Sequence, residues 1–136
     1  MKFRLKYAFL SNFHPCEVEY EGIKYPTAEH AFQASKTMII ESREEIAKLE
    51  SPASAKHAGH FVPLRPDWEQ VKLQVMLDIL RIKFQNPRMR DALIGTNGVK
   101  LIEENEWNDT FWGVCNGRGQ NHLGKLLMQV RSELCG

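Results

Sequence analysis

Apolar residues recur at helical spacing through the second half of the chain. Between residues 66 and 84 they fall mostly three or four positions apart, until Asn86-Pro87 ends the pattern, which predicts a long central helix. A shorter helix is predicted over residues 87–94, ending at Gly95. The last apolar positions share one face of a predicted final helix: Leu123, Leu126, Leu127, Val130 and Leu134.

Short extended segments are predicted in three places. Residues 16–20 and 22–25 have the composition of two strands, with Glu21-Gly22 as the turn of a small hairpin. Residues 3–9 form another candidate strand near the start of the chain, and residues 100–103 form one near its end.

Two further helices are predicted between the hairpin and the central helix. Ser42 opens a capping-box pattern that predicts a helix to about Leu49. Ser51, followed by proline, begins another helix that Gly59 should end.

The helix that follows the hairpin carries the most informative polar residues. Thr27 is a favourable N-cap, so this helix should begin at about Ala28 and place Glu29 in its first turn. The helix dipole favours an ionised carboxylate there, and the spacing brings Gln33 and Lys36 onto the same face. An active-site carboxylate is one interpretation. The alternative is an acidic first turn that merely stabilises the helix by a few tenths to ~1 kcal/mol.

These elements together predict the fold class. The strands are too few and too short to alternate with helices as in a doubly wound parallel sheet. A chain of 136 residues suits one compact domain. We therefore expect a mainly α fold, a single compact multihelical domain over residues 1–136 with a small antiparallel β-sheet or hairpin.

Charge and hydropathy narrow the class of partner. With 18 basic and 17 acidic residues, the chain lacks the global electrostatic footprint of a protein that wraps nucleic acid. No apolar stretch is long enough for a signal sequence or a membrane span. The sequence predicts a cytoplasmic protein that does not associate with a membrane.

The cysteines and histidines predict neither a disulfide framework nor a metal site. Cys16, Cys115 and Cys135 are widely separated and odd in number, which is typical of reduced thiols. His57 and His60 lie three apart without an acid or cysteine at ligand spacing. No cofactor is expected.

Two aromatic segments are candidates for binding a flat ring. Asp109, Trp112 and Gly113 lie close together in the chain, a combination suited to stacking a ring on Trp112 while the acid contacts its edge or an attached sugar. A core tryptophan with Asp109 capping a turn is the alternative. Trp68 has the same ambiguity, and Arg65 either grips a phosphate or pairs with Asp67 or a helix end.

The loop before the last helix is a candidate anion site. Gly119, Gly124 and Lys125 have the spacing of a phosphate loop, but the hydroxyl residue that should follow is missing, so a nucleoside triphosphatase is not expected. Backbone amides at the entry to the helix, with Asn121 as a side-chain donor, could still bind a phosphate oxygen. Alternatively, Asn121 caps the helix.

The order of several motifs resembles that of one known family. FLSNFHP (9–15), YPTAEHAFQASK (25–36), RPDW (65–68), KFQN (83–86), NDTFWG (108–113) and GQNHLGKLLMQVR (119–131) together resemble the NADAR family, which includes the YbiA-like proteins. The resemblance covers nearly the whole chain. It implies the YbiA-like fold and a hydrolase that cleaves an N-glycosidic bond at ribose C1.

The resemblance also implies the class of substrate. Some family members split phosphoribosylated aminopyrimidine intermediates of riboflavin synthesis, and others remove ADP-ribose from guanine bases. A small ribose phosphate or ADP-ribose compound is therefore the expected partner, with an ADP-ribosylated nucleic acid as a further candidate. The rival hypothesis is a non-catalytic module that binds ADP-ribose or NAD.

The chemistry at ribose C1 suggests roles for individual residues. Glu29 would stabilise the oxocarbenium charge or activate water, and Asp109 would be a second carboxylate that contacts ribose hydroxyls or water. Lys36 permits a second mechanism, in which its amine captures the opened sugar as a Schiff base. The expected substrate-binding residues are Asn12, Phe13, Tyr25, Arg65, Trp68, Trp112, Gly113 and Asn121.

Overall fold

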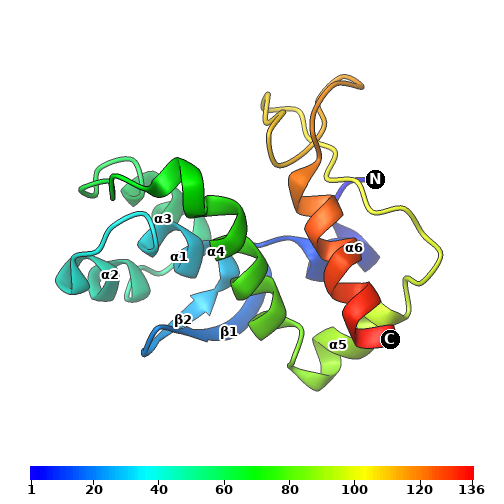
Figure 1. The fold of residues 1–136 in the computed structure, drawn as a ribbon, viewed down its shortest axis with the longest axis horizontal. Helices are drawn as coiled ribbons and strands as arrows, with labels where there is room; N and C mark the ends of the chain where they lie inside the picture. Colours follow the sequence, from blue (N-terminus) through cyan, green and yellow to red (C-terminus); the bar gives the residue numbers. More distant parts are fainter. The chain divides into compact units, whose positions relative to one another are not determined.

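The computed structural model describes all residues from 1 to 136 and shows two compact units. One unit comprises residues 12–83, and the other combines residues 1–11 with residues 84–136. The protein is mainly helical, with one two-stranded antiparallel sheet, as the sequence predicts (Figure 1).

The unit of residues 12–83 holds the sheet and four helices. Its elements are β1 (Pro15–Tyr20), β2 (Ile23–Thr27), α1 (Ala28–Ala34), α2 (Ile40–Ala47), α3 (Pro52–Ala58) and α4 (Trp68–Lys83). Val18 lies opposite Tyr25 in the hairpin. The turn residues Glu21 and Gly22 have φ of 49° and 85°, the left-handed conformation of tight hairpin turns.

Helix α1 forms the centre of this unit. It contacts both strands and each of α2, α3 and α4 (Figure 1). All seven of its residues are buried, including the polar side chains of Glu29, His30 and Gln33. Buried polar groups lack water and need hydrogen-bond partners within the protein. The side chains of Glu29, His30 and Gln33 therefore depend on partners from the surrounding elements.

The other unit contains η1 (Leu5–Leu10), α5 (Pro87–Ile94) and α6 (His122–Cys135). Helix α5 contacts both η1 and α6. The core of this unit includes the fully buried side chains of Leu10, Leu93, Leu101 and Leu127. A long segment without regular structure joins α5 to α6 and carries the aromatic motif around Trp112.

Most predicted elements are confirmed, but residues 3–9 are not a strand. Residues Leu5–Leu10 form a 3₁₀-helix in which the Ser11 N–H donates to the Ala8 carbonyl at 3.0 Å. A strand needs a neighbour for its backbone groups, and the single sheet of this protein pairs only β1 with β2. Local hydrogen bonds satisfy these backbone groups instead.

Two other predictions from the sequence are wrong in detail. Helix α2 begins at Ile40 and not at Ser42, and no side chain caps it. Residues 100–103 form no strand. Asn121 accepts a hydrogen bond from the Glu103 N–H and donates one to the Leu101 carbonyl, and the nearby β-bridge between Glu104 and Val114 is isolated. No helix is both long and apolar enough to span a bilayer.

Candidate functional site

Glu29 lies where the sequence predicts, in the first turn of α1. The Thr27 hydroxyl accepts the His30 N–H at 3.1 Å and caps the helix. The Glu29 N–H donates to the Asn12 carbonyl at 3.0 Å, which fixes the backbone ahead of β1 to the start of the helix. The predicted cap is therefore confirmed, and one further backbone contact anchors Glu29.

The side chain of Glu29 is buried, with 8% of the residue exposed. Its Oε2 accepts a hydrogen bond of 2.7 Å from Gln33 Nε2, one turn further along the helix. A buried carboxylate needs such donors, because burial away from water disfavours its charged form. Gln33 is thus a direct polar partner of the carboxylate that is predicted to be catalytic.

Lys36 follows the end of α1 and experiences the charge of Glu29. Burial lowers the pKa of Lys36, the charge of Glu29 raises it, and the charges of Lys56 and Lys72 lower it further. The net lowering increases the neutral fraction of the amine, the form that acts as a nucleophile.

Asn12 is buried beside α4. Its Nδ2 lies 3.4 Å from the sulfur of Met76, and its Oδ1 has no hydrogen-bond partner within the protein. Gln33 Oε1 is in the same state. Buried hydrogen-bond acceptors are rarely left unpaired in folded proteins. Here two of them belong to Asn12 and Gln33, which both bond Glu29.

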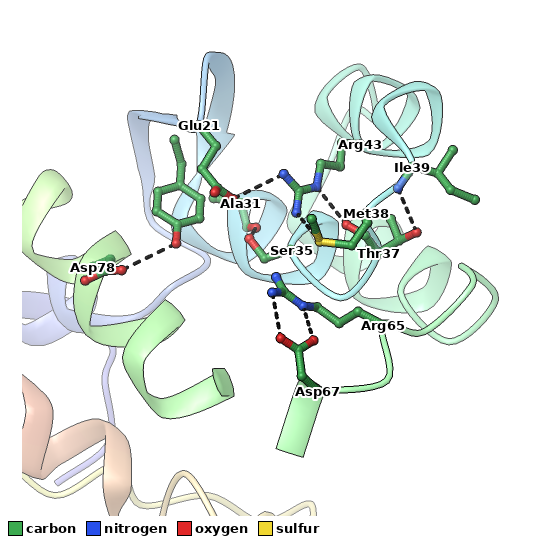
Figure 2. Close-up of polar contacts among 11 residues, drawn as sticks. Glu21, Ala31, Ser35, Thr37, Met38, Ile39, Arg43, Arg65, Asp67 and Asp78 are labelled. Atoms are coloured by element: carbon green, nitrogen blue, oxygen red, sulfur yellow. Dashed lines mark hydrogen bonds and ion pairs between the residues drawn. The ribbon is translucent and has the colours of Figure 1, made fainter. Parts of the chain in front are cut away.

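Arg65 pairs with Asp67, one of the alternatives that the sequence leaves open. Its Nε and Nη2 donate to the two carboxylate oxygens at 2.7 and 3.0 Å, and Figure 2 shows the two groups facing each other. The Arg65 N–H donates to the Lys36 carbonyl at 2.7 Å. The backbone of Arg65 is therefore held close to Lys36, and its guanidinium is paired with Asp67.

The aromatic candidates of this unit differ in exposure. Tyr25 is buried in β2, and its pKa is raised to about 12, chiefly by burial. Trp68 is buried at the start of α4, with its ring centroid 5.1 Å from that of Phe32. Phe13 lies in the loop before β1 and is 40% exposed. Tyr25 and Trp68 are core residues, whereas Phe13 reaches the surface.

In the other unit, Asp109 caps its own loop. Its Oδ1 accepts the N–H groups of Phe111 and Trp112 at 3.2 and 2.9 Å. The Asn105 side chain accepts the Asp109 N–H at 3.0 Å and donates to the Asp109 carbonyl at 2.9 Å. The turn-capping alternative is therefore observed, and a catalytic role for Asp109 stays a prediction.

Trp112 and Gly113 follow in the same loop. The Trp112 ring meets Phe111 edge-on, with centroids 4.8 Å apart. A Cβ on Gly113 would lie 1.8 Å from Glu103 Oε2 and 2.2 Å from the Glu103 carbonyl oxygen. Glycine at this position is required by close packing within the loop.

The backbone amides before α6 are already hydrogen-bonded within the protein. The N–H groups of Gln120, Asn121, His122 and Leu123 donate to the carbonyls of residues 110–113 at 2.7 to 3.2 Å. Asn121 caps nothing with its side chain, which bonds Leu101 and Glu103 instead. The amides expected to bind phosphate are therefore used to hold the aromatic loop against the start of the helix.

The candidate residues thus form two groups. Glu29, Lys36, Asn12, Phe13, Tyr25, Arg65 and Trp68 belong to residues 12–83, and Asp109, Trp112, Gly113 and Asn121 belong to the other unit. The structure brings Glu29, Lys36 and Asn12 together through backbone and charge contacts. No group of three or more His, Cys, Asp or Glu side chains is arranged to hold a metal ion.

Sequence reasoning missed two buried cations. Arg43 donates from Nε to the Thr37 carbonyl at 2.7 Å and from Nη1 to Glu21 at 3.2 Å, which ties α2 to the hairpin turn (Figure 2). Lys83 has no exposed surface, and burial lowers its pKa to about 7. Nothing in the spacing of these residues indicates burial.

Comparison with known proteins places the chain in a family. A model of the NADAR domain matches residues 2–135. This chain belongs to the NADAR family. The NADAR chain is 44% identical over 132 residues to the N-glycosidase YbiA of Shigella boydii, a match that covers 94% of this chain and 82% of that protein.

Two further relatives extend the comparison. A riboflavin biosynthesis protein of Vibrio vulnificus is 36% identical over 132 residues, which is 94% of this NADAR chain and 36% of that protein. The NMR structure of YbiA from E. coli has a TM-score of 0.86 at 41% identity and covers 99% of this chain and 84% of that one. The fold is that of YbiA, and the expected enzyme class, a hydrolase of N-glycosyl compounds, agrees with the relatives' names.

Proposed function

We propose that this protein hydrolyses the N-glycosidic bond at ribose C1 of a phosphoribosylated aminopyrimidine or of an ADP-ribosylated base. The class of reaction is supported by the relatives named N-glycosidase, and the riboflavin link by the Vibrio vulnificus protein. We choose Glu29 as the catalytic group because its carboxylate is buried and accepts a hydrogen bond from Gln33. Its charge also raises the pKa of the Lys36 amine.

In the proposed reaction the bond between C1 and the base nitrogen breaks, and its electron pair leaves with the nitrogen. Positive charge develops on C1 and the ring oxygen, and an ionised carboxylate beside them lowers the barrier. Glu29 is that carboxylate. In direct hydrolysis a water molecule adds to C1 and gives its proton to Glu29 or to the leaving nitrogen.

Lys36 supports a second route. Its neutral amine would attack C1 as the base departs, and opening of the sugar ring would leave an imine between C1 and Nζ, which water then hydrolyses. A lysine needs desolvation to attack at neutral pH. The lowered pKa of Lys36, caused mainly by burial, is in keeping with that requirement, and this route stands second to direct hydrolysis.

The proposal is tested with a panel of four compounds: a phosphoribosyl aminopyrimidine, NAD, ADP-ribose and an ADP-ribosylated guanine. Each is incubated with the purified protein, and the products are identified by mass. Release of a free base together with a ribose product from at least one phosphoribosyl or ADP-ribosyl compound supports the proposal. Tight calorimetric binding of ADP-ribose with no product from any compound would instead favour the non-catalytic module.

A further inference from the structure

The side-chain amide of Gln33 lies between Glu29 and Gly59. A carboxylate only accepts hydrogen bonds, so the bond of 2.7 Å to Glu29 Oε2 requires Gln33 to present its NH₂ group to Glu29. Gln33 Oε1 then faces away from the carboxylate, where it is buried without a hydrogen-bond partner in the protein. The amide is therefore arranged to satisfy Glu29 and leaves its own oxygen unsatisfied.

Gly59 provides the space that this arrangement needs. It closes α3 with φ −60° and ψ −21°, an ordinary helical conformation that any residue adopts. Backbone geometry therefore does not require glycine there. A Cβ at this position would lie 1.9 Å from Gln33 Oε1 and 2.8 Å from its Cδ, so any larger residue would displace the amide.

We propose that Gln33 is a positioning residue that holds the Glu29 carboxylate in one orientation for the reaction, and that the missing side chain of Gly59 leaves the room that the Gln33 amide needs. This inference rests on the proposed role of Glu29. It adds a supporting residue from the same helix and one from the end of α3, neither of which is expected to touch the substrate.

The physical reason is the limited freedom of a buried carboxylate. A hydrogen bond from Gln33 favours the ionised form of Glu29 and fixes one carboxylate oxygen. Without it, the Glu29 carboxylate loses a contact that fixes its orientation toward the position where charge develops on the sugar. Displacement of a catalytic group by ~1 Å can cost about 100-fold in rate, whereas substrate binding changes little if the displaced group acts mainly in the transition state.

Steady-state kinetics of four variants, Gln33→Met, Gly59→Ala, Gln33→Ala and the double variant Gln33→Ala with Gly59→Ala, test the inference on the substrate that the wild type hydrolyses. Gln33→Met keeps the length of the side chain and removes the amide; we expect kcat to fall about 10- to 100-fold with KM within about twofold of the wild type. Gly59→Ala should lower kcat in the same way, since its methyl group displaces Gln33. In a Gln33→Ala background, Gly59→Ala should cause no further loss beyond about twofold, because the atoms it displaces are absent.

Two matched controls accompany these variants. Gly95 ends α5 with φ −61° and ψ −17°, and a Cβ there meets only backbone oxygens at 3.3 Å, so Gly95→Ala repeats the substitution without displacing a side chain. Gln129 pairs with Glu133 at the same helical spacing on the exposed face of α6, so Gln129→Met removes a similar bond far from the proposed chemistry in sequence. Both should keep the wild-type kcat. Circular dichroism verifies that each variant is folded.

Different results overturn different statements. If Glu29→Gln is impaired but Gln33→Met and Gly59→Ala have the wild-type kcat, Gln33 is not a positioning residue. A raised KM with unchanged kcat in Gln33→Met would make Gln33 a substrate contact and also overturn the inference.

Equal losses from Gly59→Ala in both backgrounds would disprove the link between Gly59 and Gln33. Normal turnover by Glu29→Gln would remove the proposed role of Glu29 and the inference with it. If Gln33→Met does not fold, Gly59→Ala still decides the matter.

Discussion

The Thr27 hydroxyl lies 2.7 Å from His30 Nδ1 and accepts the His30 backbone N–H at 3.1 Å. His30 Nε2 lies 3.0 Å from the Leu49 carbonyl, which can only accept, so Nε2 carries the ring proton. Nδ1 therefore accepts the hydroxyl proton of Thr27, and burial lowers the pKa of His30 in keeping with a neutral ring. The His30 side chain thus links Thr27, the N-cap of α1, to Leu49 in the segment that follows α2.

Replacing Thr27 tests this link. Thr27→Val keeps the shape and removes the hydroxyl, and we expect it to lower the free energy of unfolding by about 1 to 2 kcal/mol, at the upper end for N-caps, because two contacts are lost. Thr27→Ser should stay close to the wild type. Urea unfolding measures both, and equal stability of the valine and serine variants would contradict the assigned role.

Glu29→Gln should separate charge from structure. The new amide oxygen can still accept the Gln33 hydrogen bond, so folding should be retained. Turnover should fall by ~10² to 10⁴ if the carboxylate acts as acid, base or charge stabiliser. Product release measured by mass, beside a circular dichroism spectrum, tests both expectations, and near-normal turnover would exclude Glu29 as the catalytic group.

Borohydride trapping tests Lys36. An imine between the sugar and Nζ would be reduced to a stable amine, so peptide mapping should find an adduct on Lys36 after incubation with substrate and borohydride. Lys36→Met should lose both the adduct and most of the turnover. Lys125→Met is the matched control, since Lys125 is an exposed lysine of α6 that is not among the charges that shift the pKa of Lys36. Active enzyme that gives no adduct in repeated trials would favour direct attack by water.

Asp109 is expected to matter through its hydrogen bonds. Asp109→Asn keeps an oxygen that can accept the Phe111 and Trp112 N–H groups, whereas Asp109→Ala loses both bonds. The alanine variant should therefore be less stable by about 1 to 3 kcal/mol, with the asparagine variant in between. Asp109→Asn should lose less turnover than Glu29→Gln. An equal loss in a folded Asp109→Asn protein would show that the charge of Asp109 takes part in catalysis.

Lys83 should make stability depend on pH. Its pKa is lowered from 10.5 to about 7 in the folded protein, so between these values the unfolded chain binds a proton that the folded protein releases. The contribution is unfavourable below pH 7 and disappears as the pH rises toward 10.5, with a slope of at most about 1.4 kcal/mol per pH unit.

The measurement is urea unfolding at pH 7, 8 and 9. Lys83→Met removes the buried amine, so its stability advantage over the wild type should shrink as the pH rises. The exposed Lys125 of α6 offers a matched control, because Lys125→Met should leave the pH dependence unchanged. A Lys83→Met difference that is constant across this range would contradict a proton released from Lys83.

Elements whose signals are local can be predicted from the sequence. The Glu21-Gly22 turn, the Thr27 and Ser51 caps and the glycine after α5 are all confirmed at or near the predicted positions. Each depends on residues a few positions apart, whose φ preferences and side-chain bonds act within one turn of chain. The first-turn position of Glu29 was determined in the same way.

What these residues contact depends on tertiary packing and could not be predicted from the sequence. Asn121 looks like a cap or a phosphate ligand in the sequence, yet its side chain bonds Leu101 and Glu103. The packing of Gln33 against Gly59 and the burial of Lys83 likewise depend on residues distant in the chain. Spacing reveals which residues share a helix face, but hydrogen-bond partners and lost hydration are set by whichever segment folds against that face, and local preferences do not specify that segment.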